Sequence, residues 1–228
     1  MALAPASRDR RVMFAMDFRD PVTGLGVTDL EVGAESLGPP IRPPSGRFVW
    51  LDYDPPAERK IKVRATSRRK AFADFEELIT AAAHLPGTSA ATLLKTRWLM
   101  PSGLYEPPEG LTAAAGWRVE DAGKTPVEDA KVAIAIRHDG HQNFTGSYRA
   151  VTDAKGGFVA VVNDLGDIRP EATPADPARP GIDLGVLAWL VVHRGNTVKY
   201  SDLQPLRVGR LVRFAEPFLW SALRNNPP

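Results

Sequence analysis

The sequence contains no cysteine, and this absence excludes several kinds of structure and chemistry. Disulfide bonds, zinc sites built from thiolates and cysteine nucleophiles are all ruled out. Because disulfides would be the sign of an oxidising compartment, the redox environment of the protein stays open.

Long apolar segments and an excess of one charge are lacking as well. The longest apolar runs, such as residues 184–192, are far shorter than the roughly 20 residues that a membrane-spanning helix needs. Residues 1–11 also lack the apolar centre of a secretory signal. We therefore expect a soluble protein made in the cytoplasm, without membrane insertion. The 29 basic and 27 acidic residues nearly balance, so the net charge of the whole molecule gives no strong electrostatic attraction to nucleic acid.

Proline and glycine are abundant, with 21 and 19 residues spread along a chain of 228. The short intervals between these residues favour many short strands joined by turns. A hydrophobic content of 43% is sufficient to form hydrophobic cores. We predict a mainly β protein with two β-sandwich domains in tandem. The predicted segments are a flexible arm at 1–10, a first domain at 11–100, a second domain at 101–216 and an apolar tail at 217–228.

Alternating apolar residues in the first half predict strands at residues 11–18, 27–34, 47–53 and 59–65. In the last of these strands, Ile61, Val63 and Ala65 would point into the core. Three basic residues would then line its outer face: Lys60, Lys62 and Arg64.

Residues 69–84 have a different pattern. Their apolar residues have the spacing of a helical stripe: Phe72, Phe75, Leu78 and Ile79. We therefore predict one short helix at about residues 69–84, inserted in or after the first domain. In the second half, the nearly continuous apolar run at 184–193 predicts a centrally buried strand, and residues 169–181 predict a proline-rich surface loop.

The two halves share a weak internal repeat. The segment that begins at Asp17 matches the segment that begins at Arg118. Each is followed by a glycine, one or two residues before a Phe-Val pair, at residues 45–49 and 155–159. Glycine permits a tight turn with positive φ just before a strand whose phenylalanine enters the core.

The second half resembles the carboxypeptidase regulatory-like, transthyretin-like β-sandwich family. The resemblance covers residues 104–165 well and residues 11–65 faintly. The residues that carry it are Gly116, Val119–Asp121, Pro126, Val127, Ala130, Val132, Thr152, Asp153, Gly156, Gly157 and Phe158. The first half departs from the pattern, since residues 43–45 replace the Thr-Asp pair before the glycine, and it is Ig-like only in a general sense.

The resemblance implies a noncatalytic Greek-key sandwich of about seven strands, used as a spacer, stabiliser or contact module. By analogy of architecture, such domains look like accessory parts of phage tails and of tail-like contractile injection particles. A final location in a virion or tail-like particle follows as an expectation.

No group of residues indicates catalysis, a cofactor or a metal. His138 and His141 flank a glycine and predict a solvated hairpin tip, without the helical His-Glu-x-x-His pattern of zinc peptidases. Four aspartates could supply calcium ligands, but their spacing does not require a calcium-binding loop. They are expected to cap turns: Asp52, Asp54, Asp164 and Asp167.

Two segments are candidates for contact with partners. Seven basic residues fall between Arg59 and Lys70, without the exposed aromatic residues that nucleic-acid binding would favour. They predict a solvated face that protects an edge strand, or a contact with an acidic protein neighbour. The tail is the second candidate, because it either caps the core or contacts a partner; Phe218, Leu219 and Trp220 would be its contact residues. The basic candidates are Arg59, Lys60, Lys62 and Arg64.

These observations favour a nonenzymatic structural protein that contacts the protein subunits of a larger assembly. The alternative is a carbohydrate- or ligand-binding module, because exposed tryptophans can stack on sugars. Most of the tryptophans fall within strand patterns, which leaves Trp220 as the best candidate for an exposed one. A hydrolase with a dispersed site is a third possibility.

Overall fold

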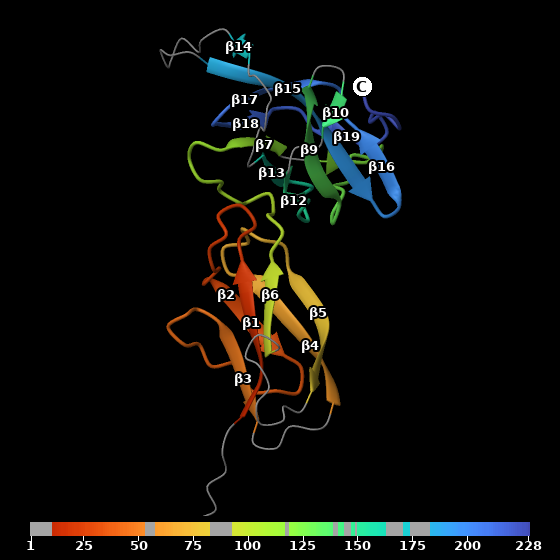
Figure 1. Cartoon of the computed structure of the whole chain (residues 1–228). Coiled ribbons are helices and arrows are strands. Elements are labelled where there is room, and N and C mark those ends of the chain that lie inside the picture. Colours follow the sequence, from red (N-terminus) through yellow and green to blue (C-terminus); the bar gives the residue numbers. More distant parts are fainter. Residues whose placement is uncertain are drawn as a thin grey trace, which may run out of the picture. The chain divides into compact units, whose positions relative to one another are not determined.

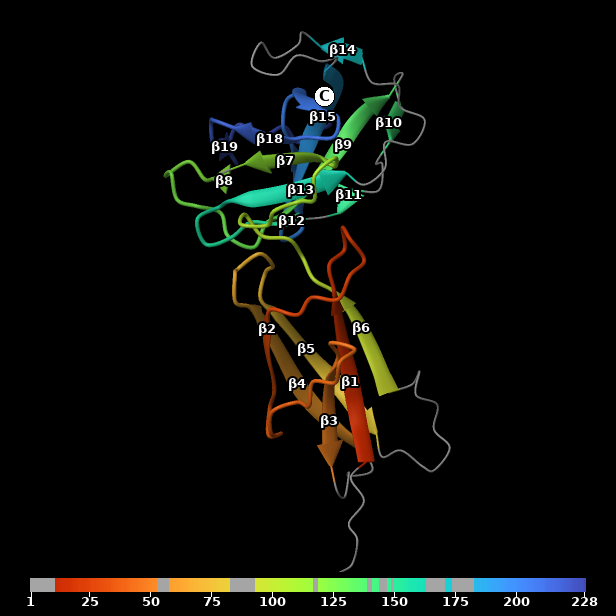
Figure 2. The ribbon, with the colours of Figure 1, turned by 90° about the vertical axis from the view of Figure 1, so that its left-hand side faces the viewer.

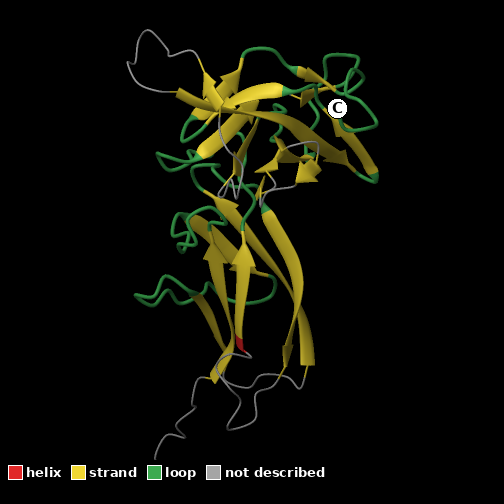
Figure 3. Ribbon diagram, turned by 45° about the horizontal axis from the view of Figure 1, so that its top comes forward, coloured by secondary structure: helices red, strands yellow, loops and turns green. Residues whose placement is uncertain are grey.

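Strands dominate the computed structural model of the chain, and the described part contains essentially no helix (Figures 1 and 3). The structure describes residues 11–52, 58–82, 93–116, 119–138, 141–143, 147–148, 150–162, 171–173 and 183–228. The predicted mainly β class is confirmed. The predicted arm at 1–10 and most of the predicted loop at 169–181 lie outside the described residues.

The chain forms two units, each with its own core. The first unit consists of Met1–Asp20, Gly24–Arg68 and Asp74–Leu99. The second consists of Pro21–Thr23, Arg69–Ala73 and Met100–Pro228. Two short early segments therefore belong with the second unit.

The first unit contains two three-stranded sheets (Figures 1 and 2). One has the order β3-β1-β6, with strands Phe48–Asp52, Arg11–Arg19 and Leu94–Trp98. The other has the order β2-β4-β5, with strands Leu30–Ala34, Glu58–Ser67 and Phe75–Ala82.

Aromatic contacts occupy the core of the first unit. Phe14 stacks on Trp50 at 4.6 Å between ring centroids, and Phe18 meets Phe75 of the other sheet edge-on at 5.2 Å. From β4, the predicted inward residues are buried, as the alternation requires: Ile61, Val63 and Ala65. A register shift between Val12 and Phe14 leaves Val12 36% exposed, which breaks the alternation expected at the start of β1.

The helix predicted at residues 69–84 is wrong over its described part, because Phe75–Ala82 is strand β5. It pairs antiparallel with β4 along eight residue pairs, from Glu58 opposite Ala82 to Ala65 opposite Phe75. The pairing satisfies the backbone groups of β5 that face β4, and Ile79 is buried whereas Leu78 points outward. The apolar spacing fits the period of a helix and that of a strand, and the neighbouring strand decides between them.

Within the described residues, no helix has the length and apolar character that crossing a membrane requires.

The second unit has more and shorter strands. Its largest sheet has the order β10-β9-β15-β14, with β12 on β9 and with β16 and β17 on β15. A four-stranded sheet has the order β11-β13-β7-β18, and β19 pairs with β8. The strands are β7 Thr112–Gly116, β8 Val119–Glu120, β9 Lys131–His138, β10 His141–Asn143, β11 Ser147–Tyr148, β12 Ala150–Val151, β13 Phe158–Val162, β14 Glu171–Thr173, β15 Asp183–Arg194, β16 Thr197–Tyr200, β17 Gln204–Arg207, β18 Leu211–Phe214 and β19 Phe218–Leu219.

Strand β15 lies in the middle of the largest sheet, as its apolar sequence predicts. Leu190 and Val192 point into the main core together with Ile134 and Phe158. The middle of the opposite face of β15 is buried as well, since Trp189 and Val191 pack in a smaller cluster with alanines of β9, whereas Leu187 on that face is 45% exposed. A strand buried on both faces needs apolar residues at nearly every position, which explains the run. Part of the predicted proline-rich loop is the short strand β14, which also pairs with β15.

The second unit repeats the strand pairing of the first. Strand β1 pairs antiparallel with β3 and parallel with β6, and β7 likewise pairs antiparallel with β13 and parallel with β18. In the other sheet, β2, β4 and β5 pair antiparallel in that order, as do β9, β15 and β17. The weak sequence repeat therefore has a counterpart in the topology of the two units.

The glycine turns of the repeat have the predicted conformation. Gly46 and Gly156 both have φ of 77°, and each donates its N–H to the carbonyl three residues earlier, at 3.0 and 2.8 Å. Each turn leads into a strand that opens with a buried phenylalanine: Phe48 and Phe158. In the second unit, Asp153 Oδ1 also accepts N–H bonds from Lys155 and Gly157, at 2.8 and 2.9 Å. A proline at the corresponding position of the first unit cannot make these side-chain contacts.

Candidate functional site

The first candidate surface is the outer face of the β2-β4-β5 sheet. Lys60, Lys62 and Arg64 alternate along β4 with the buried Ile61 and Val63, as predicted. The predicted edge position is wrong, because β4 is the central strand of its sheet.

Arg59 belongs to the other set of side chains on β4. It has the parity of Ile61 and Val63, so it points to the core side at the end of the strand, where it is half-buried. The four basic candidates of β4 are therefore divided between two faces, and the outer face has three of them.

Glu76 of β5 balances much of the positive charge on the outer face. Its two carboxylate oxygens lie 2.8 Å from Lys62 Nζ and 2.7 Å from Arg64 Nε. Hydrogen bonds from Lys62 and then from Arg64 hold the pKa of Glu76 below its ordinary value. Glu31 adds a second carboxylate 3.4 Å from Arg68. This surface is therefore a mixed-charge face, whose cations are already partly neutralised.

One apolar side chain lies within this mixed-charge face. Leu78 is opposite Lys62 in the β4–β5 register and is 59% exposed. The helix predicted for this segment would place Leu78 in a buried apolar stripe. The strand instead presents it to solvent between Glu76 and Thr80.

A second ion pair joins the two sheets of the first unit at one side. Arg97 of β6 forms a two-pronged contact with Glu77 of β5, with both N–O distances at 2.5 Å. The hydrogen bond from Arg97 lowers the pKa of Glu77. Arg97 Nη1 also donates to the carbonyl of Thr96 at 2.8 Å on the edge strand β6. Charged side chains at a strand edge disfavour further strand pairing, so this edge is protected.

The second candidate surface is the C-terminal segment, which the structure places on the core of the second unit. Phe218 lies 5.2 Å from Phe214 and 6.1 Å from Phe158 between ring centroids. Strand β19 pairs with β8, and Leu223 is buried. Of the three predicted contact residues, only Leu219 counts as exposed, at 39%.

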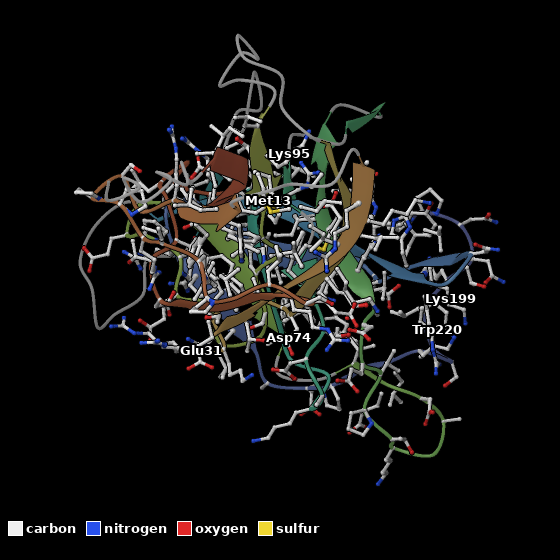
Figure 4. All side chains as sticks on the ribbon, turned by 90° about the horizontal axis from the view of Figure 1, so that it is seen from below. Met13, Glu31, Asp74, Lys95, Lys199 and Trp220 are labelled. Carbon is white, nitrogen blue, oxygen red and sulfur yellow. The ribbon has the colours of Figure 1, made fainter. Side chains whose placement is uncertain are left out.

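Trp220 is covered by two basic side chains. Lys199 Nζ lies 4.8 Å from the ring centroid and donates to the Trp220 carbonyl at 2.8 Å (Figure 4). The guanidinium of Arg194 lies 5.9 Å from the same ring. The backbone N–H of Trp220 donates to the Glu120 carbonyl at 2.6 Å. The residue chosen from the sequence as the exposed tryptophan is therefore held in contacts within its own unit.

Trp98 is the exposed tryptophan that the sequence analysis missed. It is 55% exposed at the end of the edge strand β6, whereas Trp50 and Trp189 are 2% exposed. Its neighbours in the sequence are Arg97 and the buried Leu99, a pattern that does not distinguish the two faces of a short strand. Trp117 lies outside the described residues.

The histidine hairpin has the predicted backbone, since His138 of β9 pairs directly with His141 of β10. No group of three or more potential metal-binding residues occurs among the side chains that the structure describes. Asp52 ends strand β3, while Asp54, Asp164 and Asp167 lie outside the described residues.

Comparison with known proteins adds no relative to this picture. No family model matches the chain, and neither the curated proteins nor the solved structures include a significant match to it.

Proposed function

We propose that the chain is a noncatalytic structural protein that contacts the protein subunits of a larger assembly. In this proposal, two transthyretin-like β-sandwiches lie in tandem, and the assembly is of the kind found in phage tails and tail-like contractile injection particles. The observation that carries it is the repetition of one strand order in both units. Repeated sandwiches without a shared site are typical of spacers and contact modules.

The pairing of the first strand supports a transthyretin-like sandwich over an immunoglobulin-like one. In immunoglobulin constant domains, the first two strands share a sheet. Here β1 and β2 belong to different sheets, and so do β7 and β9. The first strand instead pairs with the strand after the glycine turn, whose residues carry the family resemblance in the second half.

The mixed-charge face of the first unit is the surface that we assign to partner contact. Exposed Leu78 supplies apolar area, and the ion pairs around it supply a polar rim, which is the usual layout of a protein interface. Lys60 is exposed and makes no ion pair with a described residue. It is therefore the cation that remains for an acidic neighbour.

Affinity purification from the native lysate tests this proposal. A tagged chain should recover a defined set of protein subunits after cross-linking, and Lys60→Glu should reduce that recovery. Lys155→Glu is the matched control, because Lys155 is exposed on a turn of the second unit and undergoes the same change of charge. A wild-type chain that stays monomeric and recovers no subunit contradicts the proposal. Neighbouring genes for sheath, tube or baseplate proteins would support the type of assembly.

A further inference from the structure

Trp98 lies among polar side chains on the outer face of the β3-β1-β6 sheet. Strands β1 and β6 are parallel, with Asp17 opposite Thr96 and Arg19 opposite Trp98. Residues directly opposite on neighbouring strands point to the same face and are about 5 Å apart. Trp98 and Thr96 are exposed, so an indole ring faces solvent beside an arginine and an aspartate.

The arginine of this group is held in place. Arg19 Nε and Nη2 donate to Asp17 Oδ2 at 3.0 and 2.9 Å, and Nη1 donates to the Gly24 carbonyl at 3.1 Å. The Arg19 side chain is 39% exposed, and the Asp17 side chain is 10% exposed. A ligand would therefore meet a preorganised guanidinium, whose ordering is complete before binding.

The far side of Arg19 is open. Gly26 is its bridge partner, and a Cβ built on Gly26 would meet no atom within 4 Å. Trp98, Arg19 and Gly26 thus follow one another across three neighbouring backbone segments of the first unit. The result is a shelf with an aromatic ring at one end, hydrogen-bonding groups in the middle and free space at the other end.

The charge of the shelf restricts its ligand. Asp17 balances Arg19, so the shelf carries no net charge to attract a phosphate or a sulfate group. A guanidinium and a carboxylate side by side can donate to and accept from neighbouring hydroxyl groups. The exposed indole offers a flat apolar surface. A pyranose ring has both complementary features, because one of its faces presents C–H groups and its edge presents hydroxyls.

We infer that this shelf, with Trp98 at one end and the Arg19–Asp17 pair in the middle, is a binding site for a neutral saccharide. The sugar ring stacks on the Trp98 indole, and its hydroxyls bond to the Arg19–Asp17 pair. This inference is independent of the proposed assembly role, because the shelf and the mixed-charge face lie on different sheets. An exposed tryptophan beside an arginine can also anchor a protein partner, and the experiment distinguishes that case.

Isothermal titration of the full chain with defined oligosaccharides tests the inference. The neutral probes are cellohexaose, chitohexaose and maltohexaose, and chondroitin sulfate is the anionic comparison. We expect saturable binding of at least one neutral probe, weakened about tenfold or more by Trp98→Ala, which corresponds to about 1.4 kcal/mol. Trp98→Phe should retain part of the affinity because it keeps an aromatic face, and Arg19→Lys should weaken binding because it loses the fixed fork.

Leu104→Ala is the matched control variant. Leu104 is exposed to a similar extent, 62% against 55% for Trp98, and belongs to the second unit, outside both proposed binding surfaces. Its removal should leave saccharide binding unchanged. The inference is overturned if the wild type binds no neutral probe up to about 10 mM, well beyond a weak millimolar Kd. Equal binding by folded Trp98→Ala, or a preference for chondroitin sulfate, also overturns it. Loss of protein partners in Trp98→Ala without saccharide binding would assign the shelf to a protein contact instead.

Discussion

At the scale of single residues, close approach and ion pairing determine which positions tolerate change. Gly103 packs against the turn that carries the family resemblance. A Cβ at this position would lie 2.5 Å from Asp153 Oδ2 and 2.6 Å from the Gly157 carbonyl carbon. The neighbouring Pro101 carbonyl accepts the Val151 N–H at 3.0 Å, so this segment is fixed on both sides of Ser102. The sequence predicts only that Gly103 lies close to the start of the second domain, at residue 101.

Gly103→Ala should therefore destabilise the second unit. The added methyl group meets backbone atoms that cannot rotate away, and overpacking of this kind costs about 1–3 kcal/mol. Urea unfolding, followed by near-ultraviolet circular dichroism, measures the change. Gly33→Ala is the control, because a Cβ at Gly33 would meet nothing within 4 Å. Equal stability of the two variants would contradict the close packing.

Glu77→Gln should lower the stability of the first unit by about 1 kcal/mol at neutral pH, since the two-pronged contact with Arg97 is only partly screened by solvent. The pKa of Glu77 is lowered in the folded chain, mainly by its hydrogen bond from Arg97. The ion pair therefore contributes fully above the ordinary glutamate pKa of about 4.3. Its contribution is lost as the pH falls through the lowered pKa.

The difference between wild type and Glu77→Gln should consequently shrink on acidification. Thermal unfolding at a series of pH values down to the acid transition measures it. Glu76→Gln provides the comparison, because Glu76 also has a lowered pKa but its side chain is 50% exposed, so a smaller loss is expected. If the stability difference between wild type and Glu77→Gln instead grew toward low pH, the ion pair would be excluded as its cause.

At the scale of elements, pairing partners decide what a segment becomes. The sequence of β5 fits a helix and a strand, and β4 offers it eight residue pairs. The C-terminal segment is another case, because its apolar residues fit a partner contact and a core cap equally well. The structure uses Phe218 and Leu223 in the core of the second unit.

Deleting residues 217–228 should destabilise the second unit by about 3 kcal/mol or more, because it uncovers Phe158 and removes the pairing of β19 with β8. Deleting only residues 225–228 should have little effect, since the backbone bonds between Arg224 and Tyr200 at 2.9 Å are kept. Differential scanning calorimetry compares the two truncations. Phe218→Ala provides a milder test if the longer deletion prevents folding. Full stability of both truncated chains, with loss of a partner, would show that the segment serves an interface.

At the scale of the whole molecule, the repeated strand order explains why a weak sequence repeat is meaningful. Few positions match between the halves, but the matches fall at turns and at the first core residue after them, such as Gly46 with Phe48 and Gly156 with Phe158. These positions fix the direction of the chain, and the strands between them need only alternate. Two copies of one topology can therefore diverge in nearly all other residues.

The basic and acidic residues, which nearly balance in number, are also arranged in space in a way that composition does not reveal. On the outer face of β4, the basic run is met by Glu76 from β5 and, through Arg68, by Glu31 from β2. The part of the basic run that lies on this face thus becomes a mixed-charge face when its neighbours are added: Lys60, Lys62, Arg64 and Arg68.

The sequence by itself determined the mainly β class, the buried positions of β4, the central place of β15 and the glycine turns of the repeat. All of these depend on local features: the period of apolar residues, the length of an apolar run, or the freedom of glycine at positive φ. Tertiary structure alone decided that β5 is a strand, that β4 is central, and that Trp98 is exposed while Trp220 is covered. Strand pairing and burial join residues far apart in the chain, so no window of neighbouring residues contains that information.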